Sequence, residues 1–452
     1  MATTRRLAEL IGELVFGDLP GEVVDYSKAL ALSAIGATVA GSSRAAGRIM
    51  TAHVRRAGGL PVATVCGAGL KTSVEVAAMA NATFAHATEY EDDSFPEAVS
   101  TYTIFPPVFA LGEKVRASGR EVIEAFVVGY ETQARIALAC PEARRRGLLT
   151  LSVAGALGCA AAGARLLKLS SDRTAMALSL AASQASGIAA QTGTMAHLFE
   201  MGVAARNGLT AALLADGGFT GRADILEVPG GFFEIITGGR VPTLQEVVDA
   251  WGKPFRVMSV GIKMHPCCYH LQRIIEGVQL LKQEGRVVAS QIERVQVEVN
   301  TFIPQIIKYQ EPSNEEEAQF SLSHAVAAAL LEDQIGPRSF GAEKIHEPSF
   351  REMRGKVEMV VRDEWGWETV GWTPQITIVL ADGRRLTRGH SHAKGQPPDL
   401  LKFDDVIEKY RACVGREVAM GKIEATVRMV RGLEDLADVG ELIVAVERLR
   451  GS

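Results

Sequence analysis

The chain has 452 residues, 47% of them hydrophobic and 22% charged, which is typical of a globular protein with two or three domains. Its formal net charge is -5, and no basic excess or stripe of the kind that nucleic-acid binding needs is present, so we expect no nucleic-acid partner. The six cysteines are scattered and form no C-x-x-C pair. This usage favours reduced thiols and a cytoplasmic protein.

Two long uncharged runs, at 147–164 and 174–199, are long enough to be tested as membrane spans. The first is mostly Ala and Gly, and the second contains several Ser, Gln and Thr residues and a histidine, so we expect neither to enter a membrane. Near the start, Glu9 and Glu13 interrupt the segment that follows Arg5 and Arg6. That pattern predicts an amphipathic helix rather than an export signal.

Up to about residue 255 the pattern is mainly helical. Apolar residues at 7, 10, 11 and 14 repeat at helical spacing, and Pro20 introduces a second helix that continues through 27–40. A short strand is expected at 62–65, and Ser73 is a suitable N-cap for the helix after it. Further apolar helices are expected at 120–138, 151–167, 172–190 and 202–216.

The character of the chain changes near Arg256. Alternating apolar residues predict strands, and Asp382-Gly383 predicts a hairpin turn after the last of them. The strands are expected at 257–263, 292–299, 357–361 and 375–380, with helices at 272–283 and 320–331 between them. Two more helices are expected at 403–414 and 423–450. The predicted fold is mainly α with a second α+β domain: an all-helical domain at 1–255, an α+β domain at 256–397, and C-terminal helices at 398–452 that return to the helical domain.

Polar groups gather first in the segment from His86 to Asp93. If the preceding helix persists, His86, Glu89 and Asp93 share one helical face. Two interpretations stay open for them: a solvated acidic helix end, or a divalent-metal site made from oxygen ligands.

His197 and Arg206 project from a stretch of small, apolar residues. A single histidine in such a place is more often a core residue than a catalyst. A buried guanidinium, however, normally needs an anionic partner. For Arg206 that partner is either a carboxylate of this chain or one of a substrate.

The apparent junction between domains holds one lysine, two histidines and two cysteines within eight positions: Lys263, His265, Cys267, Cys268 and His270. Ligand sites favour such junctions, but the spacing matches no known zinc motif, and we predict no metal. A nucleophilic cysteine stays open. His324 enters an apolar helix and could be an ordinary helix residue. Nucleotide-binding motifs are absent, so no nucleotide cofactor is expected.

Taken together, these segments resemble the MmgE/PrpD family, which includes 2-methylcitrate dehydratases, cis-aconitate decarboxylases and iminodisuccinate epimerases. The resemblance runs through nearly the whole chain. It is carried by Lys71-Thr72-Ser73, Ala77 to Asn81, His86, Ser183 to Gly187, Gly202 to Gly208, Gly217 to Gly221, Lys263 to Cys268 and Gln319 to Leu322. It implies a large helical domain, an inserted α+β domain, a homodimer and a small di- or tricarboxylate as substrate.

The departures from the family pattern concern acid/base residues. The family's H-A-L-D-F-D-D-T run becomes His86-Ala87-Thr88-Glu89-Tyr90-Glu91-Asp92-Asp93, so Glu89 replaces its first aspartate. His197 stands where a lysine is expected, and His324 where a tyrosine is expected. Histidines usual in the family are missing from 96–106 and 149–151, whereas Lys263 and Arg206 are retained.

The family reactions share one hard step, which is the formation or quenching of negative charge on carbon next to a carboxylate. Cationic donors stabilise such an enolate, and a base that titrates near neutral pH moves the proton. We therefore predict four catalytic residues (His197, Lys263, His324 and Glu89) and four substrate-binding residues (Arg206, His265, His270 and Asp92). The predicted enzyme needs no cofactor and is a dehydratase-like lyase; the alternatives are a dicarboxylate epimerase and a non-catalytic carboxylate-binding protein.

Overall fold

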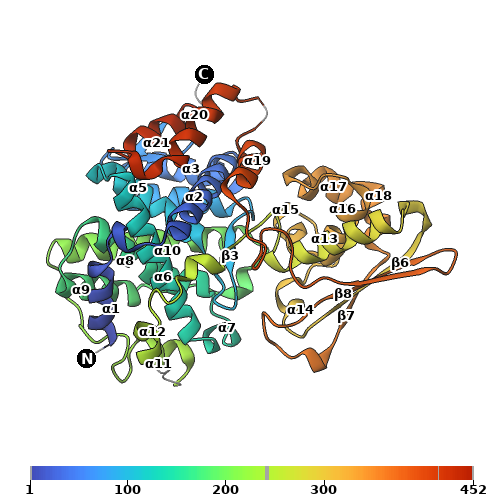
Figure 1. The fold of residues 1–452 in the computed structure, drawn as a ribbon, viewed down its shortest axis with the longest axis horizontal. Helices are drawn as coiled ribbons and strands as arrows, with labels where there is room; N and C mark the ends of the chain where they lie inside the picture. Colours follow the sequence, from blue (N-terminus) through green and yellow to red (C-terminus); the bar gives the residue numbers. More distant parts are fainter. Residues whose placement is uncertain (1–2, 240–243, 416, 450–452) are drawn as a thin grey trace. The chain divides into compact units, whose positions relative to one another are not determined.

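The computed structural model describes residues 3–239, 244–415 and 417–449 (Figure 1). Two compact units can be distinguished within it. The first comprises Met1–Gln191, Ala196–Val260 and Leu401–Ser452. The second comprises Thr192–Met195 and Gly261–Leu400.

The first unit is helical apart from two short antiparallel strand pairs. Its strands are β1 (Ala63–Val65) with β2 (Leu70–Thr72), and β3 (Asp92–Ser94) with β4 (Val99–Ser100). Its helices are α1 (Thr3–Glu13), α2 (Gly21–Ser42), α3 (Ala45–Ala57), α4 (Val74–His86), α5 (Phe105–Val115), α6 (Gly119–Ala139), α7 (Glu142–Arg145), α8 (Thr150–Leu166), α9 (Ser171–Ala182), α10 (Met195–Asp216), α11 (Phe232–Thr237), α12 (Leu244–Asp249), α19 (Phe403–Val414), α20 (Met420–Arg431) and α21 (Gly440–Glu447).

Small residues allow the central helices of this unit to pack with their backbones close together. A Cβ atom added at Gly129 of α6 would lie 2.8 Å from the carbonyl oxygen of Gly158 in α8, and one added at Gly158 would lie 2.7 Å from the oxygen of Gly129. Neither position can therefore take a side chain without moving a helix. This packing explains why the interior is rich in Ala and Gly and poor in aromatic residues.

Helix α2 is the one helix in the described part of the chain that is long and apolar enough to cross a membrane. Within its most apolar window, 89% is buried inside the protein, as expected for the core helix of a folded unit. The two uncharged runs examined in the sequence form other elements: most of α8 lies in the first, and most of α9 and the start of α10 lie in the second.

The second unit is an α+β structure built on a four-stranded sheet of order β7-β6-β8-β9. Strand β6 pairs parallel with β7 and antiparallel with β8, and β8 forms a hairpin with β9. The elements of this unit are β5 (Gly261–Ile262), α13 (Tyr269–Glu284), β6 (Ile292–Val299), α14 (Ile303–Ile306), α15 (Glu315–Ala318), α16 (Leu322–Leu331), α17 (Ala342–His346), α18 (Pro348–Arg354), β7 (Val357–Val361), β8 (Gln375–Leu380) and β9 (Arg385–Gly389).

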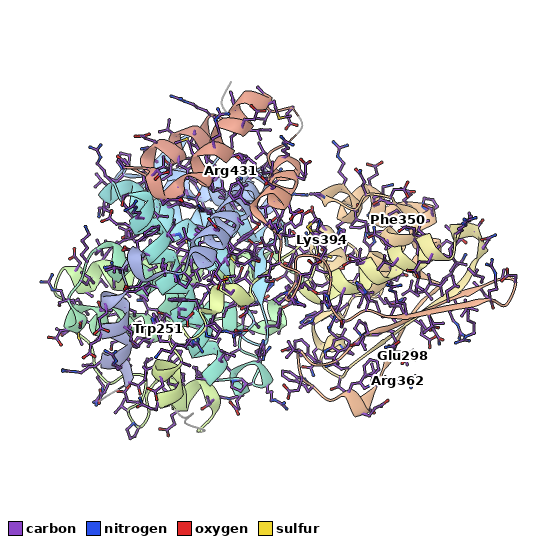
Figure 2. The ribbon with its side chains drawn as sticks, in the orientation of Figure 1. Trp251, Glu298, Phe350, Arg362, Lys394 and Arg431 are labelled. Carbon is purple, nitrogen blue, oxygen red and sulfur yellow. The ribbon has the colours of Figure 1, made fainter. Side chains whose placement is uncertain are left out.

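One face of this sheet forms the core of the second unit. Every second residue of β8 is buried, and these residues belong to one apolar cluster with residues of β6, α13 and α16. Some of the other strand side chains are charged: Glu298 of β6 pairs with Arg362, just after β7, at 2.7 Å (Figure 2). The predicted fold class, mainly α with a second α+β domain, is confirmed.

Most predicted elements form close to their predicted limits, but four differ. Helix α9 ends at Ala182, and α10 already begins at Met195. The strand predicted at 257–263 is wrong, because Arg256–Ser259 is a 3-10 helix and only Gly261–Ile262 is extended. The backbone N–H of Arg256 donates to Glu131 of α6 at 2.6 Å, instead of joining a ladder of strand hydrogen bonds. The single helix predicted at 423–450 is also wrong, since α20 ends at Arg431 and α21 begins at Gly440, with residue 450 outside the described residues.

Candidate active site

Helix α4 ends at His86, inside the helical unit. The N–H of Ala87 bonds back to Thr83 and Phe84, and Glu89, with φ of +50°, donates its N–H to the carbonyl oxygen of His86 at 3.0 Å. The predicted common helical face of His86, Glu89 and Asp93 therefore does not form. The tight turn nevertheless returns the Glu89 side chain to His86.

Two histidines and three glutamates meet at this place, and we call them the His86–His197 cluster: His86, Glu89, Glu91, His197 and Glu200. The two imidazole rings lie edge to face with centroids 4.6 Å apart. Nε2 of His86 is 3.8 Å from a carboxylate oxygen of Glu89 and 3.8 Å from one of Glu91. Nδ1 of His197 is 3.7 Å from Oε2 of Glu200, one turn further along α10. Each histidine thus has at least one carboxylate neighbour.

Burial makes these contacts electrostatically strong. The exposed fraction is 0% for His86, 2% for Glu89, 3% for Glu91 and 5% for His197. At 3.7 to 3.8 Å the pairs are ion-pair contacts rather than hydrogen bonds. In surroundings of low polarity, each carboxylate interacts more strongly with the imidazole beside it than it would in water. Glu200 is itself held, because its Oε1 accepts the backbone N–H of Ile188 at 2.6 Å.

Arg206 lies on α10 as well, nine residues after His197. Nine residues are two and a half helical turns, or about 13.5 Å, so the two side chains leave the helix on opposite sides. The Nε and Nη2 atoms of Arg206 both donate to the amide oxygen of Asn207 at 3.1 Å, and Nη1 lies 3.9 Å from the sulfur of Met79. No carboxylate in the described residues pairs with this half-buried guanidinium. The structure does not bring Arg206 and His197 together.

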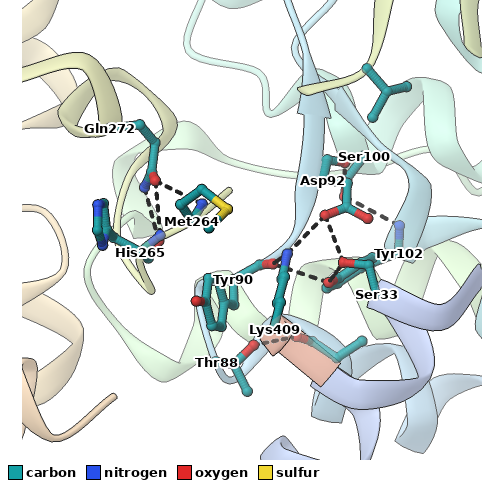
Figure 3. A network of polar contacts seen from close by, with 12 residues as sticks. Ser33, Thr88, Tyr90, Asp92, Ser100, Tyr102, Met264, His265, Gln272 and Lys409 are labelled. Atoms are coloured by element: carbon teal, nitrogen blue, oxygen red, sulfur yellow. Dashed lines mark hydrogen bonds and ion pairs between the residues drawn. The ribbon is translucent and has the colours of Figure 1, made fainter. Parts of the chain in front are cut away.

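Asp92 is fully buried and already bound to groups of the protein (Figure 3). Its Oδ1 accepts from Ser33 at 2.9 Å and from the ammonium of Lys409 at 3.0 Å. Burial raises the pKa of Asp92 to about 6, although the positive charge of Lys409 acts in the opposite direction. The predicted substrate-binding role of Asp92 therefore competes with an internal ion pair.

Three of the predicted residues belong to the segment after β5 in the second unit. Lys263 is buried, with 1% of its surface exposed, and His270 is buried with its ring 5.6 Å from that of Phe302. The Gln272 side chain bonds to the backbone N–H and carbonyl of His265 at 2.9 and 2.8 Å (Figure 3). His265 is half-buried as a residue, but its Nδ1 is fully enclosed, and this desolvation lowers its pKa to about 4. Its imidazole is therefore neutral at neutral pH.

His324 lies in the apolar core of the second unit. Its Nε2 donates to the carbonyl oxygen of Ser339 at 2.8 Å, and its ring lies 5.3 Å from that of Phe350, which Figure 2 labels. Burial, with the nearby Arg354 guanidinium, lowers the pKa of His324 to about 4. Both ring nitrogens face groups of the protein, since Nδ1 lies 3.5 Å from Arg354. This environment favours a structural role over the predicted catalytic one.

His86, Glu89 and His197 are also the set of side chains best placed to hold a metal ion. Their ligand atoms lie within 4.8 Å of one another. Two nitrogen donors and one carboxylate suit zinc or iron. A tetrahedral ion with bonds of about 2.1 Å would bring its ligand atoms to about 3.4 Å, so the cluster would have to contract to bind one.

The sequence indicated part of this cluster. It selected His197 and Glu89 as candidate catalysts, and it singled out His86 only as a member of a helical face. Glu91 and Glu200 were missed as site residues. The i,i+3 spacing of His197 and Glu200 was a usable signal. For Glu91 there was none, because its position depends on where α4 ends.

The fold and the buried cluster define a class: a helical protein whose interior holds paired imidazole and carboxylate groups, with an additional α+β unit. The MmgE/PrpD N-terminal domain matches residues 5–245, and the MmgE/PrpD C-terminal domain matches residues 265–435. The chain belongs to the MmgE/PrpD family.

Three similar proteins carry the name cis-aconitate decarboxylase. The protein from Aspergillus terreus is 28% identical over 97% of this chain and 95% of its own length. The human protein is 26% identical over 97% of this chain and 93% of its own length. The mouse protein is 25% identical over 98% and 92%. The similarity therefore spans both units.

Proposed function

We propose that the protein is a lyase that acts on a small di- or tricarboxylate, and that the His86–His197 cluster transfers the proton. The observation that carries this proposal is the buried contact of two histidines with glutamates, in a chain whose relatives are named cis-aconitate decarboxylases. Neither part suffices alone, since the names do not locate the chemistry and the cluster does not identify the substrate.

The chemistry follows from the properties of the cluster. When a bond to carbon next to a carboxylate breaks, the electron pair stays on that carbon as an enolate, which must be protonated at carbon or must expel a leaving group. A protonated imidazole can supply the proton, and a neutral one can remove it. The buried glutamates lie 3.7 to 3.8 Å from ring nitrogens of His86 and His197, so carboxylates lie beside the rings that would carry the proton. We assign proton transfer to these two histidines.

Substrate carboxylates require cations. Arg206 is the best candidate in the first unit, because its guanidinium is half-buried and bound only to a neutral amide oxygen and a thioether. Lys263, which is buried in the second unit, stays the candidate cation that the family resemblance implies for a substrate carboxylate or the enolate.

The leaving group separates two lyase reactions. Loss of water was the reaction first expected from the sequence, whereas the names of the relatives put loss of carbon dioxide first. Both need the same enolate and the same proton carrier. We therefore propose decarboxylation as the leading reaction and dehydration as the second.

The cluster gives less support to an epimerase with two bases. Such an enzyme needs its bases on opposite faces of one carbon. The rings of His86 and His197 are 4.6 Å apart, which leaves no room for a substrate between them. A two-base mechanism would have to find its second base outside this cluster.

The proposal can be tested by incubating the purified protein with a panel of di- and tricarboxylates in D2O and following proton NMR spectra. Decarboxylation would give a product with one carboxylate less and deuterium at the former carboxyl position. Dehydration would give a new vinyl signal without loss of carbon dioxide, and inversion with deuterium uptake would show epimerisation. Binding without any exchange or turnover would support the non-catalytic alternative and overturn the proposal.

A further inference from the structure

A lysine from the C-terminal part of the chain reaches into the interior of the helical unit beside the cluster. Lys409 of α19 has only 3% of its surface exposed. Its ammonium donates to the carbonyl oxygen of Tyr90 at 2.7 Å and to Oδ1 of Asp92 at 3.0 Å (Figure 3). It also lies 4.4 Å from the centre of the Tyr90 ring. One buried cation thus holds two residues of the segment that follows α4.

The Tyr90 carbonyl is held from a second side. The hydroxyl of Tyr102 donates to it at 3.0 Å and lies 2.9 Å from the hydroxyl of Ser33, which in turn donates to Asp92 (Figure 3). Lys409, Asp92, Ser33 and Tyr102 therefore form one closed network around the backbone at Tyr90. We call these four residues the Lys409 network.

The residues held by this network alternate along the chain with the glutamates of the cluster. Tyr90 lies between Glu89 and Glu91, and Asp92 follows Glu91. The network holds the Tyr90 carbonyl and Asp92, whereas Glu89 and Glu91 approach Nε2 of His86 at 3.8 Å. The bonds to the Tyr90 carbonyl and to Asp92 therefore hold the chain on both sides of Glu91.

We propose that Lys409 is a positioning residue, whose ion pair with Asp92 and bond to Tyr90 keep Glu89 and Glu91 facing His86. This inference rests on the proposed function, in which His86 and His197 transfer the proton. Lys409 would touch no reacting atom. It would act by fixing the distance between the imidazole and its carboxylates.

The energetics favour positioning over stabilisation as the reason for a buried ion pair at this place. Removing an ammonium and a carboxylate from water costs several kcal/mol for each ion, and a well-packed apolar pair is often at least as stable. The gain from such a pair lies in geometry, because a buried charge tolerates few arrangements of its neighbours.

The test compares Lys409→Met with a matched control, Lys28→Met. Lys28 is also buried in the helical unit, and its ammonium pairs with Glu434 at 2.8 Å and with Asp25 at 2.9 Å, but no contact joins it to the segment from Ala87 to Asp92 in the described residues. We expect Lys409→Met to lower kcat about 10- to 100-fold with KM changed little. Its pH–rate profile should also differ from that of the wild type, because Glu89 and Glu91 no longer keep their distance of 3.8 Å from the imidazole of His86. Lys28→Met should lower thermal stability but leave kcat and the pH profile as in the wild type.

A second variant keeps the test decisive if Lys409→Met does not fold. Tyr102→Phe removes one donor to the Tyr90 carbonyl with little change of shape, and we expect the same shift of the pH profile at a smaller loss of kcat, about 3- to 10-fold. If both variants keep the wild-type pH profile, the positioning role is overturned.

The histidine NMR titration separates this inference from the proposed function. The titration needs no substrate. It should differ between the wild type and Lys409→Met at the histidine signal that is lost in His86→Gln. A protein without turnover whose titration still depends on Lys409 would refute the lyase and support the positioning role. An active enzyme whose histidine titration and pH–rate profile are the same in the wild type and in Lys409→Met would support the lyase and refute the positioning role.

Discussion

Two histidines of this protein show how the same side chain acquires different roles from its surroundings. His197 lies 3.7 Å from a carboxylate and in ring contact with a second imidazole. His324 donates to a backbone carbonyl, and its other ring nitrogen faces an arginine. The apolar burial and the arginine neighbour of His324 favour its neutral ring and lower its pKa to about 4. Sequence position alone could not separate the two.

We predict that His197→Gln lowers kcat by about 10²- to 10⁴-fold, which is the usual contribution of a general acid or base. Glutamine keeps the polarity and approximate size of the side chain but cannot carry a proton to carbon. The measurement is steady-state turnover of the substrate identified in the deuterium experiment. His53→Gln, at an exposed position of α3, is the control and should retain full activity. Equal activity of the two variants would remove His197 from the mechanism.

For His324 we predict an effect on stability rather than on turnover. Its pKa is lowered from its usual value near 6.5 to about 4. Between these values the unfolded chain binds a proton that the folded chain does not, so the free energy of unfolding falls as the pH falls. From pH 7 to pH 5 this one group contributes a loss of about 2 kcal/mol.

Urea unfolding at pH 7 and pH 5 measures that loss. His324→Gln should be less stable than the wild type at pH 7, yet its stability should fall less between the two pH values, by about 2 kcal/mol. His265 has the same direction of shift, so part of the wild-type pH dependence should remain in the variant. An unchanged slope in His324→Gln would contradict the structural role.

At the scale of single elements, prediction succeeded where periodicity was strong. The limits predicted for β6, β7, β8 and α19 are those observed, because each has a clear apolar repeat and a turn or cap at its ends. Prediction failed at 257–263, where the alternating pattern suggested a strand. There the backbone N–H of Arg256 donates to the Glu131 side chain of α6 instead of to a neighbouring strand. A contact between residues 125 positions apart leaves no mark on local sequence.

Helix α10 packs closely against α4 at Gly202, and this close approach allows His197 of α10 to contact His86 of α4. A Cβ atom at Gly202 would overlap the hydroxyl of Thr83 and would lie 2.6 Å from the carbonyl oxygen of Met79 in α4. We expect Gly202→Ala to push the two helices apart, to cost about 1 to 3 kcal/mol of stability and to reduce turnover, since each helix carries one of the two histidines proposed to transfer the proton.

The matched control is Gly421→Ala in α20, where no heavy atom lies within 4 Å of the added carbon. This change should raise stability by about 0.5 to 1 kcal/mol, as Ala replaces Gly in a helix, and should leave turnover unchanged. The prediction is checked by measuring the thermal unfolding and the kcat of both variants. A fully active Gly202→Ala enzyme would show that the distance between α4 and α10 is not critical.

At the scale of the whole molecule, the helical body and the α+β unit could be predicted because each has its own repeat of apolar residues. The site could be predicted only in part. His86 and His197 are 111 positions apart, and only the folded chain shows that their rings touch. The resemblance to the family pointed to the segments that contain them, but the replaced acid/base residues meant that the roles could not simply be carried over.

The last prediction concerns what the whole protein needs besides its own chain. We expect turnover to survive exhaustive dialysis against a chelator, because proton transfer between imidazole and carbon needs only the charges of the His86–His197 cluster. The ligand atoms of His86, Glu89 and His197 are spread over as much as 4.8 Å, wider than the roughly 3.4 Å of a tetrahedral ion. Activity is measured before and after dialysis, with elemental analysis of the protein. The opposite result would be a loss of activity on dialysis that one equivalent of a divalent ion restores in the wild type but not in Glu89→Gln. That result would make these three residues the ligands of the ion.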